Sequence, residues 1–540
     1  MEGRRMTINK AIIPLFLFLQ FSSFCNSVPQ LSTNSRFIVD GTKRVKLACV
    51  NWVSHLQPMI AEGLEKKPLS HIASKIAETG FNCVRFTWAT FMFTRPDYYN
   101  LKVSDSLDTY NLTAAKTGIA KNNPGILGMR ILELHKAVVD ELGRNNLMVV
   151  LDNHVSRPDW CCGDDDGNGF FGDDNFDPTE WLQGLTAVAR AYKGNPAVVG
   201  MSMRNELRGK RQNETEWYKY MQEGATTIHK ESPDFLVIIS GLSYDTNLGF
   251  LRTKPLPLNL NNKLVYEAHW YTFGISADRW TAQTNNLCAV VTKMARDNYL
   301  FLTTGDNPFP LFLSEFGIDQ RGVNEAENRY ITCLLAEVAE KDIDWALWTF
   351  QGSYMLRQGT VNLEEYFGVM DVNWDRPRNP GYLDRLQVIR QVNQDLESNH
   401  PTYNIIFHPQ SGQCLQIGKA NNVFLANCKT ATRWDQHQDG GPIKLAGSPW
   451  CLTVAGDGGA ACVSNDCSGN GSKWKFVSSS GLQLGAQNGQ GKYLCLEKNN
   501  LNSTVIVSKK CLCVGDNLDD LATCAENPLV QWFKLVPVNV

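Results

Sequence analysis

Short apolar runs alternate with longer amphipathic stretches along the chain from Phe37 to about Gln394. This alternation is typical of β/α units that build a parallel sheet. The runs contain little polar alternation, as expected of strands that are buried on both faces. Eight strands are predicted, within residues 45–52, 82–88, 147–154, 197–206, 235–242, 263–271, 311–317 and 344–350. The pattern therefore predicts an α/β fold, a (β/α)8 TIM barrel with long loops.

The helical pattern ends near residue 396, and the polar stretch at 397–402 is predicted to be a linker. Residues 403–540 are rich in Gly, Asn, Ser and Cys and contain three similar segments. Each segment opens with Cys-Leu, closes with a cysteine and is followed by a tryptophan: Cys414 to Cys428 with Trp434, Cys451 to Cys467 with Trp474, and Cys495 to Cys511 with Trp532. Such a threefold repeat favours three units that share one core. We expect a separately folded, disulfide-held module that supplies no catalytic group.

Composition narrows the class of protein. The net charge of -3 and 20% charged residues argue against a nucleic-acid partner. Residues 1–27 combine basic residues, an apolar run and small residues, which is typical of a secretory signal peptide, so the barrel domain is assigned to 28–396. No later apolar run reaches eighteen residues, so a secreted protein without a membrane anchor is expected. Sixteen cysteines and sequons at Asn111, Asn213, Asn470 and Asn502 fit that compartment.

Two carboxylates lie at the ends of predicted strands, Glu206 after the fourth and Glu315 after the seventh. Glu206 on its own also fits the first turn of a helix, where the helix dipole favours an acid. The Asn-Glu pair recurs at 213–214 and 324–325, in polar stretches without a preceding strand. Closure of the barrel would bring Glu206 and Glu315 to the same rim, where TIM-barrel active sites are built. A pair of carboxyl groups is what glycoside hydrolysis requires.

Other strand ends carry polar or aromatic residues that would meet at the same rim. These are Arg85, His154, Asn205, His269, Tyr271 and Trp348. Each has a structural interpretation on its own, since strand-end histidines are often hydrogen-bonded and a strand tryptophan is usually in the core. Their convergence at one barrel face nevertheless favours a substrate-binding site.

With these residues in place, the first 396 residues resemble glycoside hydrolase family 5, in its plant cellulase-like branch. The resemblance implies that Glu206 is the acid/base and Glu315 the nucleophile, with Asn205 on the sugar 2-hydroxyl. It further implies that Arg85 orients Glu315, that His154, His269 and Tyr271 surround the reacting sugar, and that Trp348 stacks beneath it. We expect Arg85 to lower the pKa of Glu315, and the surroundings of Glu206 to raise its pKa. No cofactor or metal is expected.

The tail resembles a ricin-B-type lectin domain, an all-β trefoil that usually binds sugars. The family's Gln-x-Trp signature is degraded here, and its sugar-binding acid is replaced by Gln416 and Thr453 in the first two repeats. Only Glu497 keeps the charge, so it is the candidate lectin residue. A structural trefoil without strong sugar binding stays open as the alternative. Cys513 and Cys524 are candidates for a further pair.

Several alternatives to a β-glucan hydrolase remain open. β-Mannanase, β-glucosidase and transglycosylase activities would use the same barrel, and a glycan-binding protein on an inactive barrel is the non-enzyme alternative. Asp152-x-His154 and Glu267-x-His269 would also suit a metal-dependent hydrolase. The acidic loop 164–175 resembles a calcium loop but has Asn175 at its twelfth position, so a loop that shapes the cleft is favoured. Adjacent Cys161 and Cys162 are expected to pair with other loop cysteines. A polysaccharide or oligosaccharide partner and a monomer are expected.

Overall fold

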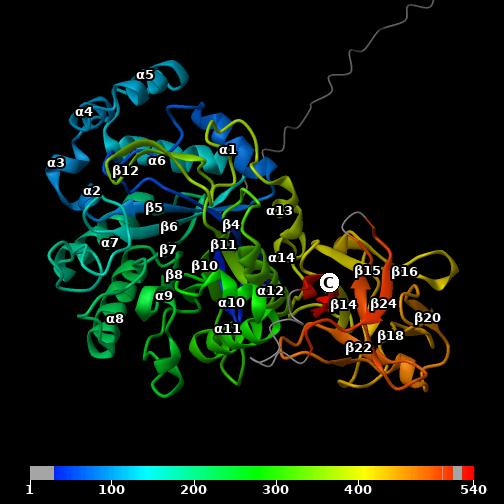
Figure 1. Ribbon diagram of the computed structural model, residues 1–540. Helices are drawn as coiled ribbons and strands as arrows, with labels where there is room; N and C mark the ends of the chain where they lie inside the picture. The colour runs from blue at the N-terminus through cyan, green and yellow to red at the C-terminus, as the bar shows by residue number, and fades with distance from the viewer. Residues whose placement is uncertain (1–29, 501–502, 515–525) are drawn as a thin grey trace, which may run out of the picture.

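The computed structural model describes residues 30–500, 503–514 and 526–540. Eight parallel strands close into a barrel, in the order β10-β11-β4-β5-β6-β7-β8-β9 (Figure 1). The strands are β4 (Ala48–Trp52), β5 (Cys83–Ala89), β6 (Met148–Val155), β7 (Val198–Ser202), β8 (Leu236–Ile239), β9 (Leu264–His269), β10 (Leu311–Phe316) and β11 (Asp344–Leu347). All eight predicted strands are confirmed, because each apolar run is buried on both faces. The predicted signal peptide at 1–27 lies outside the described residues.

Helices surround the barrel and cover the outer faces of its strands. The main ones are α1 (Leu69–Glu78), α6 (Ile131–Arg144), α7 (Pro178–Tyr192), α8 (Glu214–Glu231), α11 (Thr284–Asn298) and α12 (Glu325–Lys341). Shorter helices lie in the connections: α2 (Phe91–Thr94), α3 (Pro96–Tyr99), α4 (Val103–Thr109), α5 (Thr113–Asn122), α9 (Leu242–Asp245), α10 (Ala277–Ala282), α13 (Pro380–Arg385) and α14 (Gln387–Arg390). The side chains of Asn213 and Asn324 cap α8 and α12. Two of the three Asn-Glu pairs are therefore helix starts.

Two small sheets extend the barrel. An antiparallel sheet of β1 (Leu31–Asn34), β2 (Phe37–Asp40) and β3 (Lys43–Arg44) precedes the first barrel strand. After the last barrel strand, β12 (Ser353–Arg357) and β13 (Thr360–Glu364) form a hairpin. The hairpin was not predicted. Because it follows the carboxyl end of β11, it stands at the rim where the strand-end residues meet.

The C-terminal part consists of antiparallel strands. Its longer strands are β14 (Tyr403–His408), β15 (Gln413–Ile417), β16 (Val423–Ala426), β22 (Leu484–Gln487), β23 (Tyr493–Lys498), β24 (Ile506–Lys510) and β25 (Lys534–Val538). Two-residue or three-residue strands fill the middle: β17 (Trp434–Asp435), β18 (Lys444–Leu445), β19 (Cys451–Thr453), β20 (Cys462–Ser464) and β21 (Lys475–Phe476). Each repeat is closed by a disulfide, Cys414–Cys428, Cys451–Cys467 and Cys495–Cys511, which confirms disulfides in the tail, although the sequence alone left their pairing open. A Cys513–Cys524 pair involves a residue outside the described ranges.

The three repeats meet through their hairpins, β15–β16, β19–β20 and β23–β24. The amide of Val423 donates to Ala461, the amide of Ala461 donates to Ile506, and the amide of Leu425 donates to Thr504. Each hairpin is thus hydrogen-bonded to both others. Trp434 and Trp474 are fully buried in the core that the repeats share. This arrangement explains why the three segments have similar sequences, since each supplies one third of a common core.

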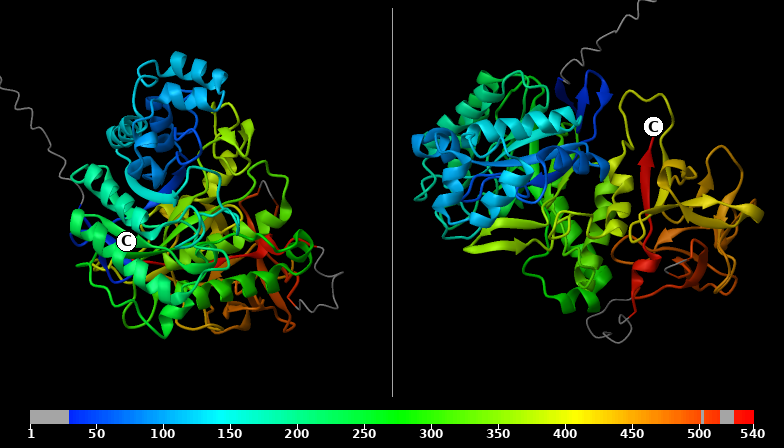
Figure 2. Two further views of the ribbon diagram at one scale, coloured as in Figure 1. Left: turned by 90° about the vertical axis from the view of Figure 1, so that its left-hand side faces the viewer. Right: turned by 90° about the horizontal axis from the view of Figure 1, so that it is seen from above.

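The C-terminal part packs directly against the barrel. In Figure 2, β25 lies between the barrel helices and the other C-terminal strands, and it contacts α12. Trp532 belongs to the same buried apolar cluster as α12 and donates its indole hydrogen to Asn285 of α11. Lys534 is paired with buried Glu337 at 3.1 Å. This buried contact argues against a loosely tethered module, although independent folding of the tail stays a prediction.

Candidate active site

The two predicted catalytic carboxylates meet at the carboxyl end of the barrel. Glu315 lies within β10, whereas Glu206 follows β7 in an irregular segment and has a left-handed φ of 42°. The helix interpretation of Glu206 is therefore wrong, because α8 begins only at Glu214. One carboxylate oxygen each of Glu206 and Glu315 and one ring nitrogen of His269 lie within 4.8 Å of one another. A left-handed non-glycine residue is costly, and such residues cluster at functional sites.

Arg85 is fully buried and is the central cation of the site. Its Nη1 donates to Glu315 Oε1 at 2.8 Å, and its Nη2 donates to Asn205 Oδ1 at 2.9 Å. The same guanidinium pairs with Asp152 at 3.0 Å and is 3.7 Å from Glu267. The predicted contact of Arg85 with Glu315 is thus present. In addition, Arg85 fixes the amide that precedes Glu206.

His269 and Tyr271 link the two carboxylates. His269 Nδ1 is 2.8 Å from Glu206 Oε1 and 3.8 Å from Glu315 Oε2. The hydroxyl of Tyr271 donates to Glu315 Oε2 at 3.3 Å. These contacts, together with that of Arg85, hold both carboxylates in defined orientations.

His154 lines the cleft and belongs to a stack of rings. Its ring lies 4.1 Å from that of His55 and 5.6 Å from that of Trp348, centroid to centroid, with nearly parallel planes. His154 Nδ1 is 2.6 Å from Asp152 Oδ2. Because a carboxylate only accepts, Nδ1 carries the hydrogen and Nε2 faces Asn205 Nδ2 at 3.4 Å as an acceptor. His154 and Asn205 are therefore in contact through their side chains.

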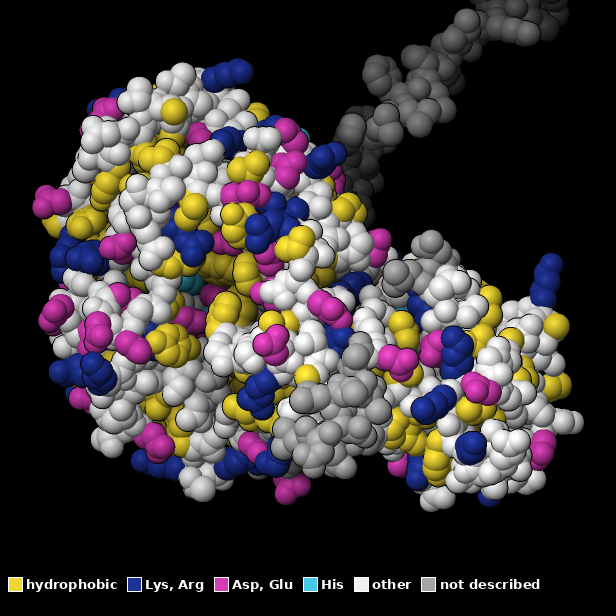
Figure 3. All heavy atoms as spheres, viewed as in Figure 1, with side chains coloured by type: hydrophobic (Ala, Val, Ile, Leu, Met, Phe, Trp, Pro, Cys, Tyr) yellow, Lys and Arg dark blue, Asp and Glu magenta, His cyan; other side chains and the backbone are white. Residues whose placement is uncertain are grey.

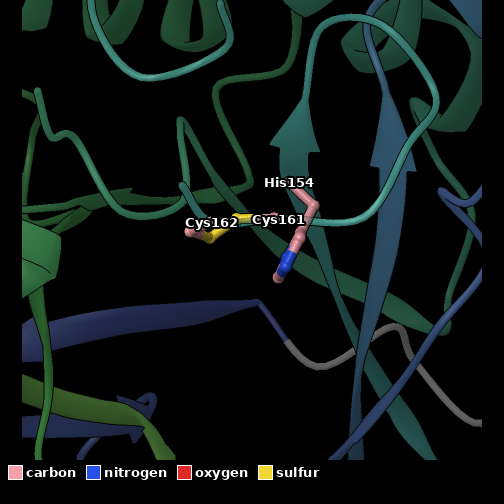
Figure 4. A group of neighbouring side chains, drawn as sticks. All are labelled: His154, Cys161 and Cys162. Atoms are coloured by element: carbon pink, nitrogen blue, oxygen red, sulfur yellow. A yellow bond between two sulfur atoms is a disulfide. The ribbon is translucent and has the colours of Figure 1, made fainter. Parts of the chain in front are cut away.

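Cys161 and Cys162 form a disulfide with each other, so the expectation that they pair with other loop cysteines is wrong. The other described barrel cysteines are already joined, as Cys49–Cys83 and Cys288–Cys333. The peptide bonds Cys161–Cys162 and Trp348–Thr349 are cis. The disulfide lies beside His154 (Figure 4), and Asn205 Nδ2 is 3.7 Å from each sulfur. It thereby forms part of the cleft wall.

The carboxylates line a cleft of about 800 Å³, visible as a hollow in the barrel face (Figure 3). One wall carries Trp160, packed beneath the guanidinium of Arg357 on the β12–β13 hairpin. The lining also includes Tyr271 stacked on Phe273, which is 74% exposed. Sequence reasoning missed Trp160 and the hairpin, because neither lies in a barrel strand. An apolar, aromatic cleft with convergent polar groups is typical of a small-molecule or saccharide site.

Burial controls the protonation of the two carboxyl groups. It raises the pKa of Glu206 to about 7, against the lowering effect of Arg208 and Arg85. It also raises the pKa of Glu315 to about 7, and the lowering by His269 and Arg85 does not offset it. Arg85 thus lowers the pKa of Glu315 as expected, but desolvation outweighs the guanidinium, so the net shift is upward. The raised pKa expected for Glu206 is present.

Three further buried acids surround Arg85 and His269. Asp152 and Glu267 contact the guanidinium, and Glu267 also accepts a hydrogen bond from Ser202. Asp245, the last of three consecutive left-handed residues, places Oδ2 3.7 Å from His269 Nε2. Asp152 and Glu267 were recognisable in the sequence as acids two positions before a strand-end histidine. Asp245 gave no such signal, because it lies beyond the end of its strand.

The metal and calcium alternatives can be compared with these contacts. His154 and His269 direct Nδ1 to Asp152 and Glu206, whereas Glu267 bonds Ser202, so the two acid-x-His motifs do not form one donor cluster. In the acidic loop, Asp166 pairs with Arg208. Elsewhere in the loop, Asp165 and Asp173 lie 3.7 and 3.6 Å from Lys210 and Arg211. Other carboxylate contacts of the loop are to backbone amides and to Tyr244. The loop is thereby tied to the segment that holds Glu206.

In the tail, Glu497 is 7% exposed. Its carboxylate accepts a hydrogen bond from Gln531 at 2.9 Å and pairs with Lys509 at 2.8 Å. Gln416 of the first repeat donates its side-chain amide to Thr430 at 2.9 Å. These positions are therefore bonded within the C-terminal part, and a role of Glu497 in sugar binding stays a prediction.

A closed (β/α)8 barrel with two carboxylates at its carboxyl end defines the class of barrel glycosidases. The model of the family "Cellulase (glycosyl hydrolase family 5)" matches residues 51–353. A glycosyl hydrolase 5 family protein of Chamaecyparis obtusa is 43% identical over 98% of this chain and 96% of its own length. The chain belongs to glycosyl hydrolase family 5 and is a glycosyl hydrolase.

More distant relatives match part of the chain. An endoglucanase of Paenibacillus polymyxa is 21% identical over 64% of this chain and 84% of its own length. The major extracellular endoglucanase of Xanthomonas campestris is 26% identical over 44% of this chain and 48% of its own length. Among solved structures, an endocellulase of Pyrococcus horikoshii matches with a TM-score of 0.54, 15% identity, and coverage of 67% of this chain and 98% of its own. The last likeness concerns the fold alone.

Proposed function

We propose that the protein is a secreted, retaining β-glycoside hydrolase that acts on β-linked glucan or a related cell-wall polysaccharide. The observation that carries this proposal is that one carboxylate oxygen of Glu206 lies within 4.8 Å of one carboxylate oxygen of Glu315. In retaining enzymes the two carboxyl groups are about 5–5.5 Å apart, whereas inverting enzymes leave about 6.5–9.5 Å for a water. The short separation supports direct attack of one carboxylate on the anomeric carbon.

In the proposed mechanism, Glu315 is the nucleophile and Glu206 the acid/base. Arg85 and Tyr271 hold Glu315 through separate oxygens, which orients a lone pair towards the sugar. Glu206 protonates the departing oxygen as Glu315 forms the glycosyl-enzyme bond, then takes a proton from the water that releases the sugar. His269 contacts Glu206, and its own pKa is lowered by burial, so the neutral ring can donate Nδ1–H to the carboxylate.

The remaining cleft residues are proposed to bind the sugar. Asn205 is held by Arg85 with its amide hydrogens towards His154 and the cleft, which suits a contact with the 2-hydroxyl. Trp348 presents a ring parallel to that of His154, which suits stacking beneath a pyranose. Similarity to cellulases supports β-glucan as the substrate. A solved structure of a Pyrococcus horikoshii endocellulase in complex with cellotetraose matches this fold with a TM-score of 0.53. A β-mannan or a small β-glucoside remains the alternative that substrate assays would identify.

Secretion and the tail belong to the same proposal. One relative is an extracellular endoglucanase, the described sequons Asn111, Asn213 and Asn470 are exposed, and disulfides join cysteines in both parts of the chain. The three interlocked hairpins support a β-trefoil over residues 403–540. Within it, Glu497 is the proposed glycan contact, tested by binding of wild type and Glu497→Ala to a glycan array. No described helix is long and apolar enough to cross a lipid bilayer.

The deciding experiment is hydrolysis of a panel of β-linked polysaccharides and aryl glycosides by the purified protein. The configuration of the first-formed product is followed by NMR. A β-glucan product of retained configuration is expected, with activity unchanged by EDTA. Inverted product would refute the assigned mechanism, and a chain inactive on the whole panel would favour the glycan-binding alternative. Sugar transferred to added acceptors, in place of water, would identify a transglycosylase.

A further inference from the structure

Two sulfur atoms and one imidazole nitrogen lie together in the cleft. No step of the proposed mechanism requires them to act together. One ring nitrogen of His154 and the Sγ atoms of Cys161 and Cys162 all lie within 4.8 Å of one another. His154 is at the end of β6, and the disulfide is on the loop that follows, with its sulfurs beside the ring (Figure 4). While the two sulfurs are joined in a disulfide they cannot bind a cation, because only the thiolate form of cysteine is a metal ligand.

The histidine of this cluster already has the surroundings of a metal ligand. Asp152 accepts the hydrogen of Nδ1 at 2.6 Å, which leaves the Nε2 lone pair directed away from the carboxylate. A carboxylate behind a histidine, on the nitrogen opposite the metal, is the usual outer contact of zinc-binding histidines. Asp152 is itself held by Arg85 at 3.0 Å, so the ring orientation is fixed without an ion.

Among the disulfides described in the barrel, Cys161–Cys162 is the one that solvent can reach. Cys162 is half-buried and lines the cleft. The other two barrel disulfides are closed to solvent, with Cys49 and Cys83 at 0% exposure and Cys288 and Cys333 at 1%. Because thiol–disulfide exchange requires direct approach of the attacking sulfur, a small reductant entering the cleft reaches this bond and not those.

We propose that reduction of Cys161–Cys162 creates, with His154, a binding site for a soft or borderline divalent cation, and that the bound cation blocks the cleft. A small thiol reductant supplies the two electrons: the S–S bond breaks, two S–H groups form, and two reductant thiols become one disulfide. The cation then displaces both thiol protons and binds two sulfurs and one nitrogen. Such a donor set suits Zn²⁺ or Cd²⁺, with Zn–S and Zn–N bonds of about 2.3 and 2.0 Å.

Blockage follows from the position of the cluster. Asn205 Nδ2 is 3.4 Å from His154 Nε2 and 3.7 Å from each sulfur, so an ion on these atoms would displace the amide. Asn205 is also the residue that Arg85 holds beside Glu206. The cation would therefore occupy the volume next to the acid/base, and the cleft would recover when a chelator removed the cation.

The test begins without substrate, so it is independent of the proposed glucan activity. The full chain is treated with limiting water-soluble phosphine, and the released thiols are located by alkylation and mass spectrometry. Cys161 and Cys162 are expected among the first labelled. Cd²⁺ is then titrated, and binding is followed by the sulfur-to-cadmium absorption band. His154→Ala is expected to bind Cd²⁺ at least about tenfold more weakly than wild type.

Two variants separate the cleft from other thiols. Cys161→Ala/Cys162→Ala should lose the reduction-dependent cadmium band, whereas the matched control Cys462→Ser, which removes an unpaired cysteine of the C-terminal part, should retain it. In an aryl-glucoside assay, Cd²⁺ should inhibit only the reduced wild type and Cys462→Ser, with recovery in EDTA. The proposal is overturned if mild reduction leaves Cys161–Cys162 intact, or if the double variant or His154→Ala binds Cd²⁺ as tightly as wild type.

Discussion

Replacing Glu206 by glutamine tests the burial argument through stability and not through turnover. In the folded chain the pKa of Glu206 is raised from 4.5 to about 7, mainly by desolvation. Below pH 4.5 the carboxyl group is protonated in both the folded and unfolded chain, so it does not affect their balance. Between pH 4.5 and 7 the unfolded chain releases the proton first, and the free energy of unfolding of the wild type falls as pH rises. Above pH 7 the penalty is constant.

The magnitude follows from the shift. Each pKa unit corresponds to about 1.4 kcal/mol, so ionised Glu206 costs the folded state up to about 3 kcal/mol at pH 8. The side chain is 13% exposed to the cleft, which makes this figure an upper limit. Glu206→Gln removes the penalty at pH 8 but has no such effect at pH 4.5. An altered contact with His269 changes the stability of the variant at both pH values. It therefore cancels when the stability difference at pH 4.5 is subtracted from that at pH 8.

The assay is urea unfolding of wild type and variant at pH 4.5 and pH 8, with equal m-values required for comparison. Glu223→Gln, which removes an exposed carboxylate on α8, is the matched control and should show no gain at pH 8. The variant is expected to be more stable relative to wild type at pH 8 than at pH 4.5, by about 1–3 kcal/mol. An equal stability difference at the two pH values would refute the claim that burial raises the pKa of Glu206.

Further predictions concern activity and the tail. Glu315→Gln should abolish turnover, while circular dichroism should show that the fold is retained. Glu206→Gln should still react once with an activated aryl glycoside, seen as a burst of released phenol. A substantially active Glu315→Gln enzyme would contradict the assignment. The pH profile of kcat/KM should peak near pH 7, because Glu315 gains a proton below it and Glu206 loses one above it; a flat profile from pH 5 to 9 would be inconsistent with these pKa values. Truncation at His400 should lower the melting temperature of the barrel by exposing apolar surface of α12, in contrast to our sequence-based expectation of an independent tail, and an unchanged melting temperature would restore that expectation. Glu497→Ala should lower the melting temperature of the C-terminal part by removing contacts to two neighbours, and an unchanged value would show that those contacts contribute little.

The sequence by itself determined the barrel and the position of its strand ends. A buried strand must be apolar along its whole length, so each of the eight runs could be recognised locally. The order of β/α units then required Glu206 and Glu315 to meet at one rim. The repeated cysteines indicated a disulfide-held tail, whereas their pairing within single repeats was shown only by the structure.

Only the tertiary structure decided the features that depend on contacts between distant segments. The dipeptide Asn-Glu begins a helix at 213–214 and at 324–325, yet at 205–206 its glutamate has a left-handed backbone, because Arg85 and His269 hold the two side chains. The balance between burial and a nearby guanidinium at Glu315 could not be predicted either, since desolvation depends on every group that surrounds the carboxylate. The docking of β25 on α12 likewise required the surfaces of both parts of the chain. Local pattern specifies elements, whereas burial, charge and contact are properties of the assembled fold.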